Sequence, residues 1–309
     1  MDAHKVQVPV IVGPTAVGKT AVVEALADTW SLAVVSADSR QIYRHLNVGT
    51  AKPDPAARAR VPHYGLDLVD PGVFYSAGQF ARDAARWLQE VQVSGRRPVV
   101  VGGTGFYVRA LADGLFHEPP MPAQARQHFR RWAAQRTGTM AGWAARLDPA
   151  FSGGGHQRAT RTVEVALLTG RSLSWWQRHA AAHALMRPWY VRLTAPRAFL
   201  HKRIADRVRD MMARGWIEEV RALLERGMPR DAPGLDGVGY REIVAHLRGD
   251  LERDRLEEAI IVSTRRYAKR QETWFRHQLQ DAPVHTLDAT ESAGAIADRI
   301  AVLWDEAEV

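Results

Sequence analysis

A glycine-rich segment near the N-terminus carries residue types that suit phosphate binding. It reads Gly13-Pro14-Thr15-Ala16-Val17-Gly18-Lys19-Thr20, after an apolar run at residues 8–12 and before a helix-compatible stretch. Its glycines let backbone N–H groups point at phosphate oxygens, Lys19 supplies a positive charge, and the Thr20 hydroxyl is a ligand for Mg²⁺. The segment therefore predicts a P-loop that holds a di- or triphosphate.

A carboxylate follows the second apolar run, residues 32–36. Asp38 stands in Ala37-Asp38-Ser39-Arg40-Gln41, which places it near the expected phosphate site. It is suited to accept a proton from a nucleophile that attacks the phosphorylated substrate, and Ser39 and Gln41 offer hydrogen bonds to a base edge. A helix cap is the other interpretation of Asp38, and it stays open.

A third candidate segment, Gly102-Gly103-Thr104-Gly105, follows the apolar run at residues 98–101. A P-loop that hydrolyses ATP normally has an acidic residue at the end of such a strand, and none stands here. The turn offers backbone donors and the Thr104 hydroxyl, which suits holding a substrate more than activating water. A plain strand-to-helix turn with Thr104 as N-cap is the alternative.

The elements that must position these segments alternate along the chain. Strand-like runs at residues 8–12, 32–36 and 98–101 are interleaved with helix-compatible stretches at 21–30, 78–93 and 106–111. This order predicts an α/β fold with a parallel, doubly wound sheet, whose ligand lies at the carboxyl ends of the strands. The three segments should therefore meet at one edge of the sheet.

The character of the chain changes after residue 117, where prolines are followed by Arg-, Ala- and Trp-rich helical stretches. We expect a helical insertion domain at residues 118–187, inside a catalytic core formed by residues 1–117 and 188–309. In the second part of the core we expect a strand at 189–193, one or two helices at 197–225, a helix at 256–280, a short strand at 284–287 and a final helix.

Length and composition permit a large buried core, since the chain has 309 residues of which 46% are hydrophobic. It shows neither an apolar stretch long enough to cross a membrane nor a signal peptide. The absence of cysteine fits a reducing compartment. We expect a cytoplasmic monomer that does not associate with membranes.

The net charge of +8 is concentrated in the middle of the chain. Residues 126–209 contain sixteen Lys and Arg against three acids, Asp148, Glu164 and Asp206, and Trp132, Trp143, Trp175 and Trp176 are interleaved with them. Such a segment suits binding to a nucleic-acid backbone with some base stacking. A solvated helix surface is the alternative interpretation of the same charges.

Taken together, these segments resemble the bacterial tRNA dimethylallyltransferase family. The matching segments are residues 13–20, 38–44, 48–53, 61–63, 102–107, 157–161, 239–242 and 264–274. They occur in one order and span nearly the whole chain. The P-loop alone would fit many kinases, and the segments beyond it make the resemblance specific.

The resemblance implies a P-loop NTPase-like fold and transfer of a dimethylallyl group from dimethylallyl diphosphate to N6 of adenosine 37, beside the tRNA anticodon. It implies that Asp38 is the general base, that Thr104 lies at the substrate channel, and that the P-loop with Mg²⁺ holds the diphosphate. It also implies a diphosphate-binding arginine, for which we expect Arg207, with Arg203 as the second candidate. The residues expected to bind the anticodon stem-loop of tRNA are Asp38, Ser39, Arg40, Gln41, Thr104, Arg126, Gln157, Arg158, Arg161, Gly239, Tyr240 and Arg241.

Three other hypotheses remain open. An adenylate isopentenyltransferase would use the same chemistry on a free nucleotide, but it gives no reason for the basic segment. A P-loop small-molecule kinase would use ATP with Asp38 activating a hydroxyl, but it lacks the acidic residue after Val101. A non-catalytic RNA-binding protein would leave the P-loop, Asp38 and the glycine turn without a purpose.

Overall fold

The computed structural model describes residues 6–114, 121–180, 184–279 and 282–308. The chain divides into two units, a core of Met1–Ala112 with Leu185–Val309 and an insertion unit of Asp113–Ala184. These limits differ by a few residues from the expected ones, of which residues 117 and 118 lie outside the described residues. Leu185 N donates to Leu111 O at 2.9 Å, which keeps the residues before the next strand with the core.

The core holds a sheet and the helices that cover it. Its strands are β1 (Gln7–Val12), β2 (Leu32–Ser36), β3 (His63–Tyr64), β4 (Arg97–Gly102), β5 (Arg187–Thr194) and β6 (Val284–Asp288). Its helices are α1 (Lys19–Leu26), α2 (Pro55–Arg60), α3 (Ala77–Val93), α4 (Gly105–Ala112), α9 (Arg197–Ala213), α10 (Trp216–Glu225), the 3₁₀ helix η1 (Pro233–Asp236), α11 (Tyr240–Arg248), α12 (Arg253–His277) and α13 (Ala293–Glu308).

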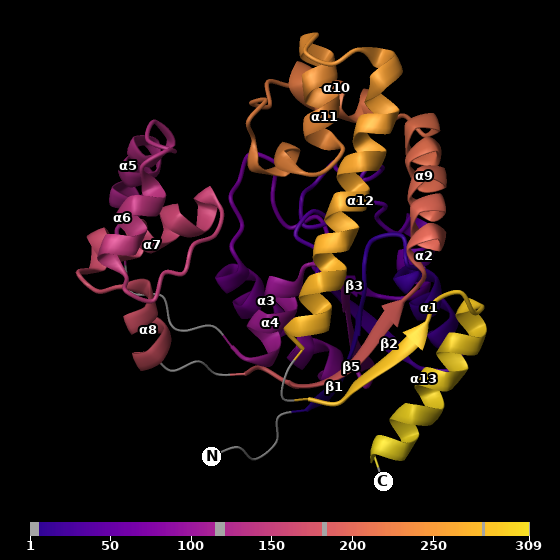
Figure 1. Ribbon diagram of the computed structural model, residues 1–309. Coiled ribbons are helices and arrows are strands. Elements are labelled where there is room, and N and C mark those ends of the chain that lie inside the picture. The colour runs from indigo at the N-terminus through magenta and orange to yellow at the C-terminus, as the bar shows by residue number, and fades with distance from the viewer. Residues whose placement is uncertain (1–5, 115–120, 181–183, 280–281, 309) are drawn as a thin grey trace. The chain divides into compact units, whose positions relative to one another are not determined.

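The sheet has the strand order β3-β2-β4-β1-β5-β6, and every pair of neighbours is parallel. In β1, Val10 lies opposite Val100 of β4, and Ile11 lies opposite Val191 of β5. All five residues of β2 are buried, as expected for a parallel strand with helices on both faces. Figure 1 shows α13 on one side of the sheet and α3 and α4 on the other. The predicted doubly wound parallel sheet is confirmed.

One face of the sheet packs against the first and last helices. Ile11 of β1 and Val34 of β2 belong to a buried hydrophobic cluster with Leu26 of α1 and with Ile300 and Trp304 of α13. The cluster joins the two ends of the described chain. It also fixes the position of α1, whose N-terminus follows the P-loop.

Helix α3 shows why a sequence pattern becomes a helix. Ser76 and Gln79 form a capping box at its N-terminus, and the buried side chains Phe80, Trp87 and Val91 recur at helical spacing. Phe80 stacks on Tyr107 of α4, with ring centroids 4.1 Å apart. This contact joins α3 to the helix that follows the glycine turn.

Some elements differ from the expectation. Helix α1 begins at Lys19 and ends at Leu26, and Gly215, with φ of 88°, separates α9 from α10. Helices α2 and α11 and strand β3 were not predicted. Helix α2 has ordinary start signals, because Asp54 accepts from Ala57 N and Pro55 follows it, whereas β3 has only two residues and gives no readable pattern.

The insertion unit consists of α5 (Ala123–Ala134), α6 (Met140–Leu147), α7 (His156–Thr169) and α8 (Leu173–His179). It has its own buried cluster, which includes Phe129, Met140 and Val163. The helical character predicted for this part of the chain is confirmed. In neither unit does the described chain contain a helix that combines the length and the apolar character needed to cross a membrane.

Candidate active site

The predicted P-loop connects β1 to α1, and its backbone includes residues with positive φ. Gly18 caps α1 with φ of 111°, and Ala16 also has a positive φ, of 64°. A side chain at Gly13 would place its Cβ 2.7 Å from Leu193 O, so the loop passes close to β5. The first turn of α1 contains no acidic residue and no side-chain cap, which leaves its N-terminus suited to an anion.

Lys19 is held by the P-loop itself. Its Nζ donates to Gly13 O and to Pro14 O, each at 2.9 Å. Burial, followed by the positive charge of Arg207, lowers the pKa of Lys19 to about 8, while Asp38 opposes this shift. The loop therefore holds a cation that an arriving diphosphate would stabilise.

Helix α9 brings the two expected arginines to the same place. Burial lowers the pKa of Arg207, Asp38 raises it, and Arg203 lowers it further, so these three charges lie within reach of one another. Arg203 Nη1 lies 3.4 Å from the position that a Cβ on Gly18 would take. Arg207 is half-buried beside Lys19 and Asp38, whereas Arg203 is exposed at the rim of the P-loop.

Asp38 lies in the turn after β2, and no helix begins there. Its Oδ1 accepts from Arg40 N at 2.8 Å, which holds the carboxylate in one orientation. The Arg40 guanidinium donates to Pro233 O at 2.8 Å and thereby ties this turn to η1. The structure therefore excludes the interpretation of Asp38 as a helix cap.

Thr104 joins the glycine turn to the Asp38 turn. Its Oγ1 accepts from Ser39 N at 3.0 Å and donates to Ser39 Oγ at 3.3 Å, and its backbone N donates to Ala37 O at 3.1 Å. The Thr104 side chain thus bonds to the Asp38 turn, while Thr104 O accepts from Tyr107 N at 2.9 Å and from Val108 N at 3.2 Å at the start of α4. The predicted meeting of the turns after β2 and β4 at one edge of the sheet is confirmed.

Helix α12 supplies two residues that sequence reasoning gave no role. Gln271, which is buried, accepts from Thr15 N through Oε1 and donates to Gly103 O through Nε2, both at 2.9 Å. Tyr267 lies beside Thr104 and Asp38, and burial, with the charge of Asp38, raises its pKa to about 12. Both residues stand in segment 264–274, so the resemblance marked their segment without indicating their contacts.

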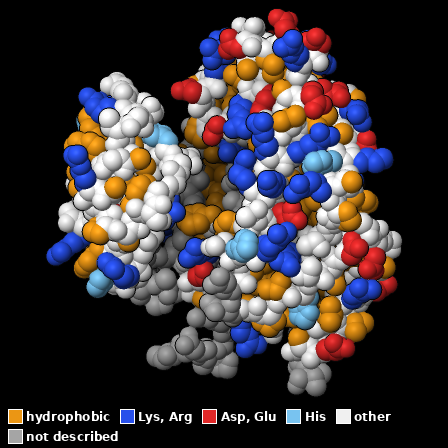
Figure 2. All heavy atoms as spheres, viewed as in Figure 1, with side chains coloured by type: hydrophobic (Ala, Val, Ile, Leu, Met, Phe, Trp, Pro, Cys, Tyr) orange, Lys and Arg blue, Asp and Glu red, His pale blue; other side chains and the backbone are white. Residues whose placement is uncertain are grey.

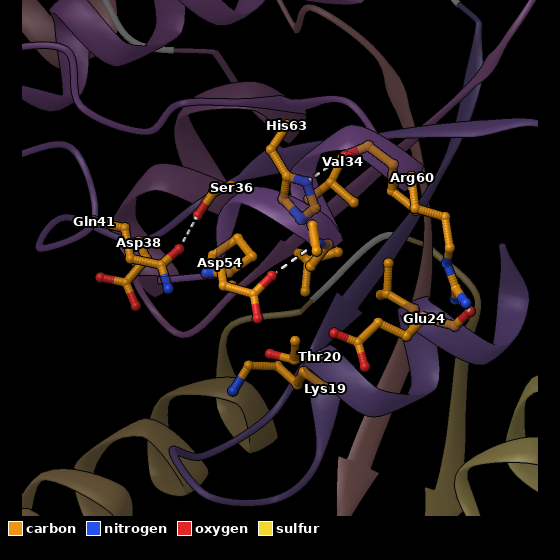
Figure 3. Close-up of a pocket in the computed structure, with 17 residues that line it drawn as sticks. Lys19, Thr20, Glu24, Val34, Ser36, Asp38, Gln41, Asp54, Arg60 and His63 are labelled. Atoms are coloured by element: carbon orange, nitrogen blue, oxygen red, sulfur yellow. Dashed lines mark hydrogen bonds between the residues drawn. The ribbon is translucent and has the colours of Figure 1, made fainter. Parts of the chain in front are cut away.

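A cavity of about 390 Å³ opens beside these groups. Lys19, Thr20 and Asp38 line one part of it, and Figure 3 shows them facing the same space as Asp54 and His63. Apolar side chains complete the lining: Val23 of α1, Val34 of β2, Val61 and Val101. The cavity thus joins a phosphate-binding end to an apolar wall.

The donor set of the cavity fits Mg²⁺. The Thr20 hydroxyl and the carboxylates of Glu24, Asp38 and Asp54 line it, and Mg²⁺ prefers oxygen ligands and keeps several waters when it also binds phosphate. Among the described residues, no group of three or more His, Cys, Asp or Glu is arranged as a metal cluster. The predicted Mg²⁺ at Thr20 thus stays a prediction that needs the diphosphate for most of its coordination.

Several residues expected to bind tRNA are engaged inside the protein. Gln41 donates from Nε2 to Thr50 O at 3.1 Å, and its Oε1 accepts from Ser36 Oγ at 2.8 Å. Gly239 is buried, as is Tyr240, which donates to Glu219 Oε1 at 2.7 Å. Arg241, the next residue, is exposed, so only this member of the segment presents its side chain to solvent.

In the insertion unit, Arg126 and Arg161 share one carboxylate with Arg130. The Glu164 side chain is 3% exposed, and all three guanidinium groups lie within salt-bridge distance of it. Gln157 and Arg158 lie exposed in the first turn of α7. Two of the four expected tRNA-binding residues of this unit therefore also stabilise its interior.

A basic surface on α12 was not predicted. Arg266, Lys269 and Arg270 line a groove together with Trp274 and His277, and Figure 2 shows Lys and Arg side chains gathered over this part of the core. The sequence signal was present in the Lys269-Arg270 pair. It lay outside the basic segment at residues 126–209 and so was not assigned to RNA.

Comparison with known proteins gives consistent matches. The family model described as "IPP transferase" matches residues 41–278, and the model described as "Isopentenyl transferase" matches residues 6–63. The protein named tRNA dimethylallyltransferase from Stenotrophomonas maltophilia is 40% identical, over 94% of this chain and 96% of its own; the protein of that name from Bordetella petrii is equally identical over the same shares. The crystal structure of the full-length tRNA isopentenylpyrophosphate transferase from Bacillus halodurans is 30% identical, has a TM-score of 0.69, and covers 98% of both chains.

Proposed function

The chain belongs to the IPP transferase family, and from that membership we propose that it catalyses prenyl transfer to tRNA. The donor is dimethylallyl diphosphate, and the acceptor is N6 of adenosine 37, next to the anticodon. The bond between C1 of the donor and its diphosphate oxygen breaks, the C1–N6 bond forms, and N6 loses one proton. The observation that carries this proposal is that Lys19 and Thr20 of the P-loop, Asp38 and apolar side chains line one cavity.

The main chemical demand is to stabilise the departing diphosphate, because an allylic group ionises with its positive charge spread over the C5 unit. Lys19, the P-loop amides and Arg207 are placed for this task. Arg207 suits it better than Arg203, because it lies near both Lys19 and Asp38. Mg²⁺ bound at Thr20 would supply further charge stabilisation for the diphosphate.

Asp38 is the proposed general base. The exocyclic amine is a poor nucleophile whose N–H becomes acidic only as the C–N bond forms, so a carboxylate of ordinary basicity is sufficient. The backbone of Arg40 orients that carboxylate. The strand-end residue after Val101 is Gly102 rather than an acid, and this supports a site that holds a phosphorylated substrate without activating water.

The apolar wall of the cavity suits the five-carbon tail of the donor. Val23 of α1, Val34 of β2 and Val61, in the link between α2 and β3, line the same cavity. Burial of a C5 group against such side chains is favourable by about 0.8 kcal/mol per CH₂. This affinity would not distinguish the donor from other short prenyl diphosphates of similar length.

The acceptor adenine must leave the stacked anticodon loop before it reaches Asp38, which costs a few kcal/mol. We propose that exposed basic residues offset this cost through phosphate contacts. Candidates are Arg158 of the insertion unit, Arg241, and the α12 residues Arg266, Lys269 and Arg270. Ser39 and Thr104 lie beside Asp38 and suit contacts to the base itself.

Because the substrate is tRNA, we propose the cytoplasm as the site of action.

A second candidate is prenyl transfer to a free adenine nucleotide. The match of the isopentenyl transferase model to residues 6–63 supports it, since those residues contain the P-loop and Asp38. It leaves the basic residues of α12 and of the insertion unit without a role.

One experiment separates these functions. The purified protein is incubated with Mg²⁺ and dimethylallyl diphosphate, and with either unmodified tRNA or AMP, and the digested products are analysed by mass spectrometry. Prenylated adenosine from tRNA alone is the expected result. Prenylated AMP would establish the second candidate, and no product from either acceptor would overturn both.

A further inference from the structure

Glu219, in the first turn of α10, binds a loop that contains none of the reacting groups. Its Oε2 accepts from Asn47 N at 2.6 Å and from Val48 N at 2.8 Å. Its Oε1 accepts from Tyr240 Oη at 2.7 Å and makes a longer contact, of 3.4 Å, with Gly49 N. One carboxylate therefore receives four donors, and an amide in its place has a single oxygen acceptor.

The same loop is confined by the Trp216 indole. A Cβ on Gly49 would lie 2.0 Å from Trp216 Nε1, and a Cβ on Gly239 would lie 2.0 Å from Trp216 Cη2. The indole thus fits between two glycines from distant parts of the chain. Both the ring, which contacts Gly49, and the Glu219 carboxylate, three residues further along α10, therefore hold loop residues 47–49.

Hydrogen bonds connect this loop to the turn that carries Asp38. Thr50 O accepts from Gln41 Nε2 at 3.1 Å, and Gln41 Oε1 accepts from Ser36 Oγ at 2.8 Å. Ser36 and Gln41 flank Asp38 in the sequence and line the cavity with it, and Figure 3 shows their hydrogen bond. A connected path of polar contacts therefore leads from α10 to the turn that carries Asp38.

We propose that Glu219 is a positioning residue for prenyl transfer: it fixes loop 47–51, the loop fixes the Gln41 side chain, and Gln41 fixes the Asp38 turn. The inference rests on the proposed function, because Asp38 is its reacting group. Glu219 does not line the cavity. It acts through residues that do, as outer hydrogen-bond partners commonly do for a reacting group.

The test compares Glu219→Gln with Glu218→Gln. Glu218 is the preceding residue of the same helix, its side chain is 64% exposed, and within the described residues it forms a local ion pair with Arg221, so it is a matched control. In single-turnover prenylation of tRNA, Glu219→Gln should lower the rate constant about tenfold. In steady-state assays, its KM for each substrate should stay within about twofold of the wild-type value. Glu218→Gln should match the wild type. Equal rates in the two variants would overturn the proposal.

A double-mutant cycle separates positioning from general loss of stability. If Glu219 acts through Gln41, Glu219→Gln in a Gln41→Ala background should cost much less than its tenfold effect in the wild type. Additive losses would contradict the proposed path. Tyr240→Phe removes one donor to Glu219 and should give a smaller effect in the same direction, which keeps the test available if Glu219→Gln folds poorly.

Hydrogen exchange supplies a readout that does not need activity. The amides of Asn47 and Val48 should exchange faster in Glu219→Gln than in Glu218→Gln, while amides of β1 and β4 stay protected. If the wild-type protein does not prenylate tRNA, the proposed function fails and the positioning role falls with it, whatever the exchange shows. If the wild type is active and Glu219→Gln changes neither rate nor exchange, this inference alone fails.

Discussion

At the scale of single residues, the site places one carboxylate among fixed cations. Burial lowers the pKa of both Lys19 and Arg207, and the Asp38 carboxylate opposes this lowering in each case. The Asp38 Oδ1 is oriented by Arg40 N. The acceptor amine would thus meet a base whose direction is set before the substrate arrives. In the proposed reaction, Lys19 and Arg207 would stabilise the leaving diphosphate while Asp38, which interacts with both, accepts the proton.

Replacing Asp38 with alanine should lower turnover at least ~100-fold, the usual effect of losing a general base, with tRNA affinity nearly unchanged. Single-turnover kinetics and equilibrium binding of tRNA measure the two quantities. Asp28→Ala serves as the control, because Asp28 is exposed and does not line the cavity. Equal losses of binding and turnover in Asp38→Ala would contradict the role of base.

Donor affinity should depend on the protonation of Lys19. Its pKa in the free protein is about 8, so the cation is present below that pH and is lost above it. Bound diphosphate favours the charged form and raises this pKa, so the affinity should be constant below pH 8 and fall by up to about tenfold per pH unit above it. Calorimetric titration with dimethylallyl diphosphate from pH 7 to 9.5 measures this. Lys19→Arg, which stays charged, should remove the decline; an identical decline in that variant would assign it to another group.

At the scale of elements, α12 contacts both glycine-rich turns, the P-loop and the turn after β4. Gln271 bridges Thr15 N and Gly103 O, and a Cβ on Gly103 would lie 2.2 Å from its Nε2. A Cβ on Gly105 would lie 2.3 Å from the Trp274 ring. The glycines of this turn therefore permit close approach of α12 and are not required only for backbone flexibility.

Removing the Gln271 side chain should destabilise the protein and weaken donor binding. Gln271→Ala leaves Thr15 N and Gly103 O without this partner, which costs about 1–3 kcal/mol for a buried group. Thermal unfolding and the KM for dimethylallyl diphosphate report the two effects. Gln278→Ala, an exposed glutamine at the end of the same helix, should change neither. Unchanged stability in Gln271→Ala would show that water replaces the bridge.

The sequence predicted elements better than the contacts between them. Strands β1, β2 and β4 and the turns that follow them come from local patterns, and the parallel sheet follows from their alternation. Gln271 and Glu219 could not be found in this way, because their partners lie 256 and 171 residues away in the chain. Tyr240 was assigned to tRNA from its segment alone, and only the fold reveals that its side chain is buried.

At the scale of the whole molecule, net positive charge is not the same as available positive charge. Arg126, Arg130 and Arg161 surround Glu164, so part of the excess in residues 126–209 supports the interior of the insertion unit. The exposed Arg158 and the basic residues of α12 present their charge to solvent. The distribution of exposed charge, and not the count, should govern RNA binding.

Arg158 and Arg161 should therefore respond differently to alanine substitution. Arg158→Ala should raise the KM for tRNA and reduce the slope of log affinity against log salt by about 1, with little change in Tm. Arg161→Ala should lower Tm, because it removes a partner of the buried Glu164 carboxylate. Arg299→Ala, in α13 outside the basic segment, is the control. An unchanged salt slope in Arg158→Ala would move the RNA contact elsewhere.

The hydrogen bond from Leu185 N to Leu111 O joins the points where the chain leaves the core and returns to it. For the folding of the sheet, residues 113–184 thus count as one closed loop. The entropy of closing a loop grows only with the logarithm of its length, so changes of size or sequence in this loop cost the core little. Over evolutionary time, the insertion is therefore free to change its surface while the turns that line the cavity keep their geometry.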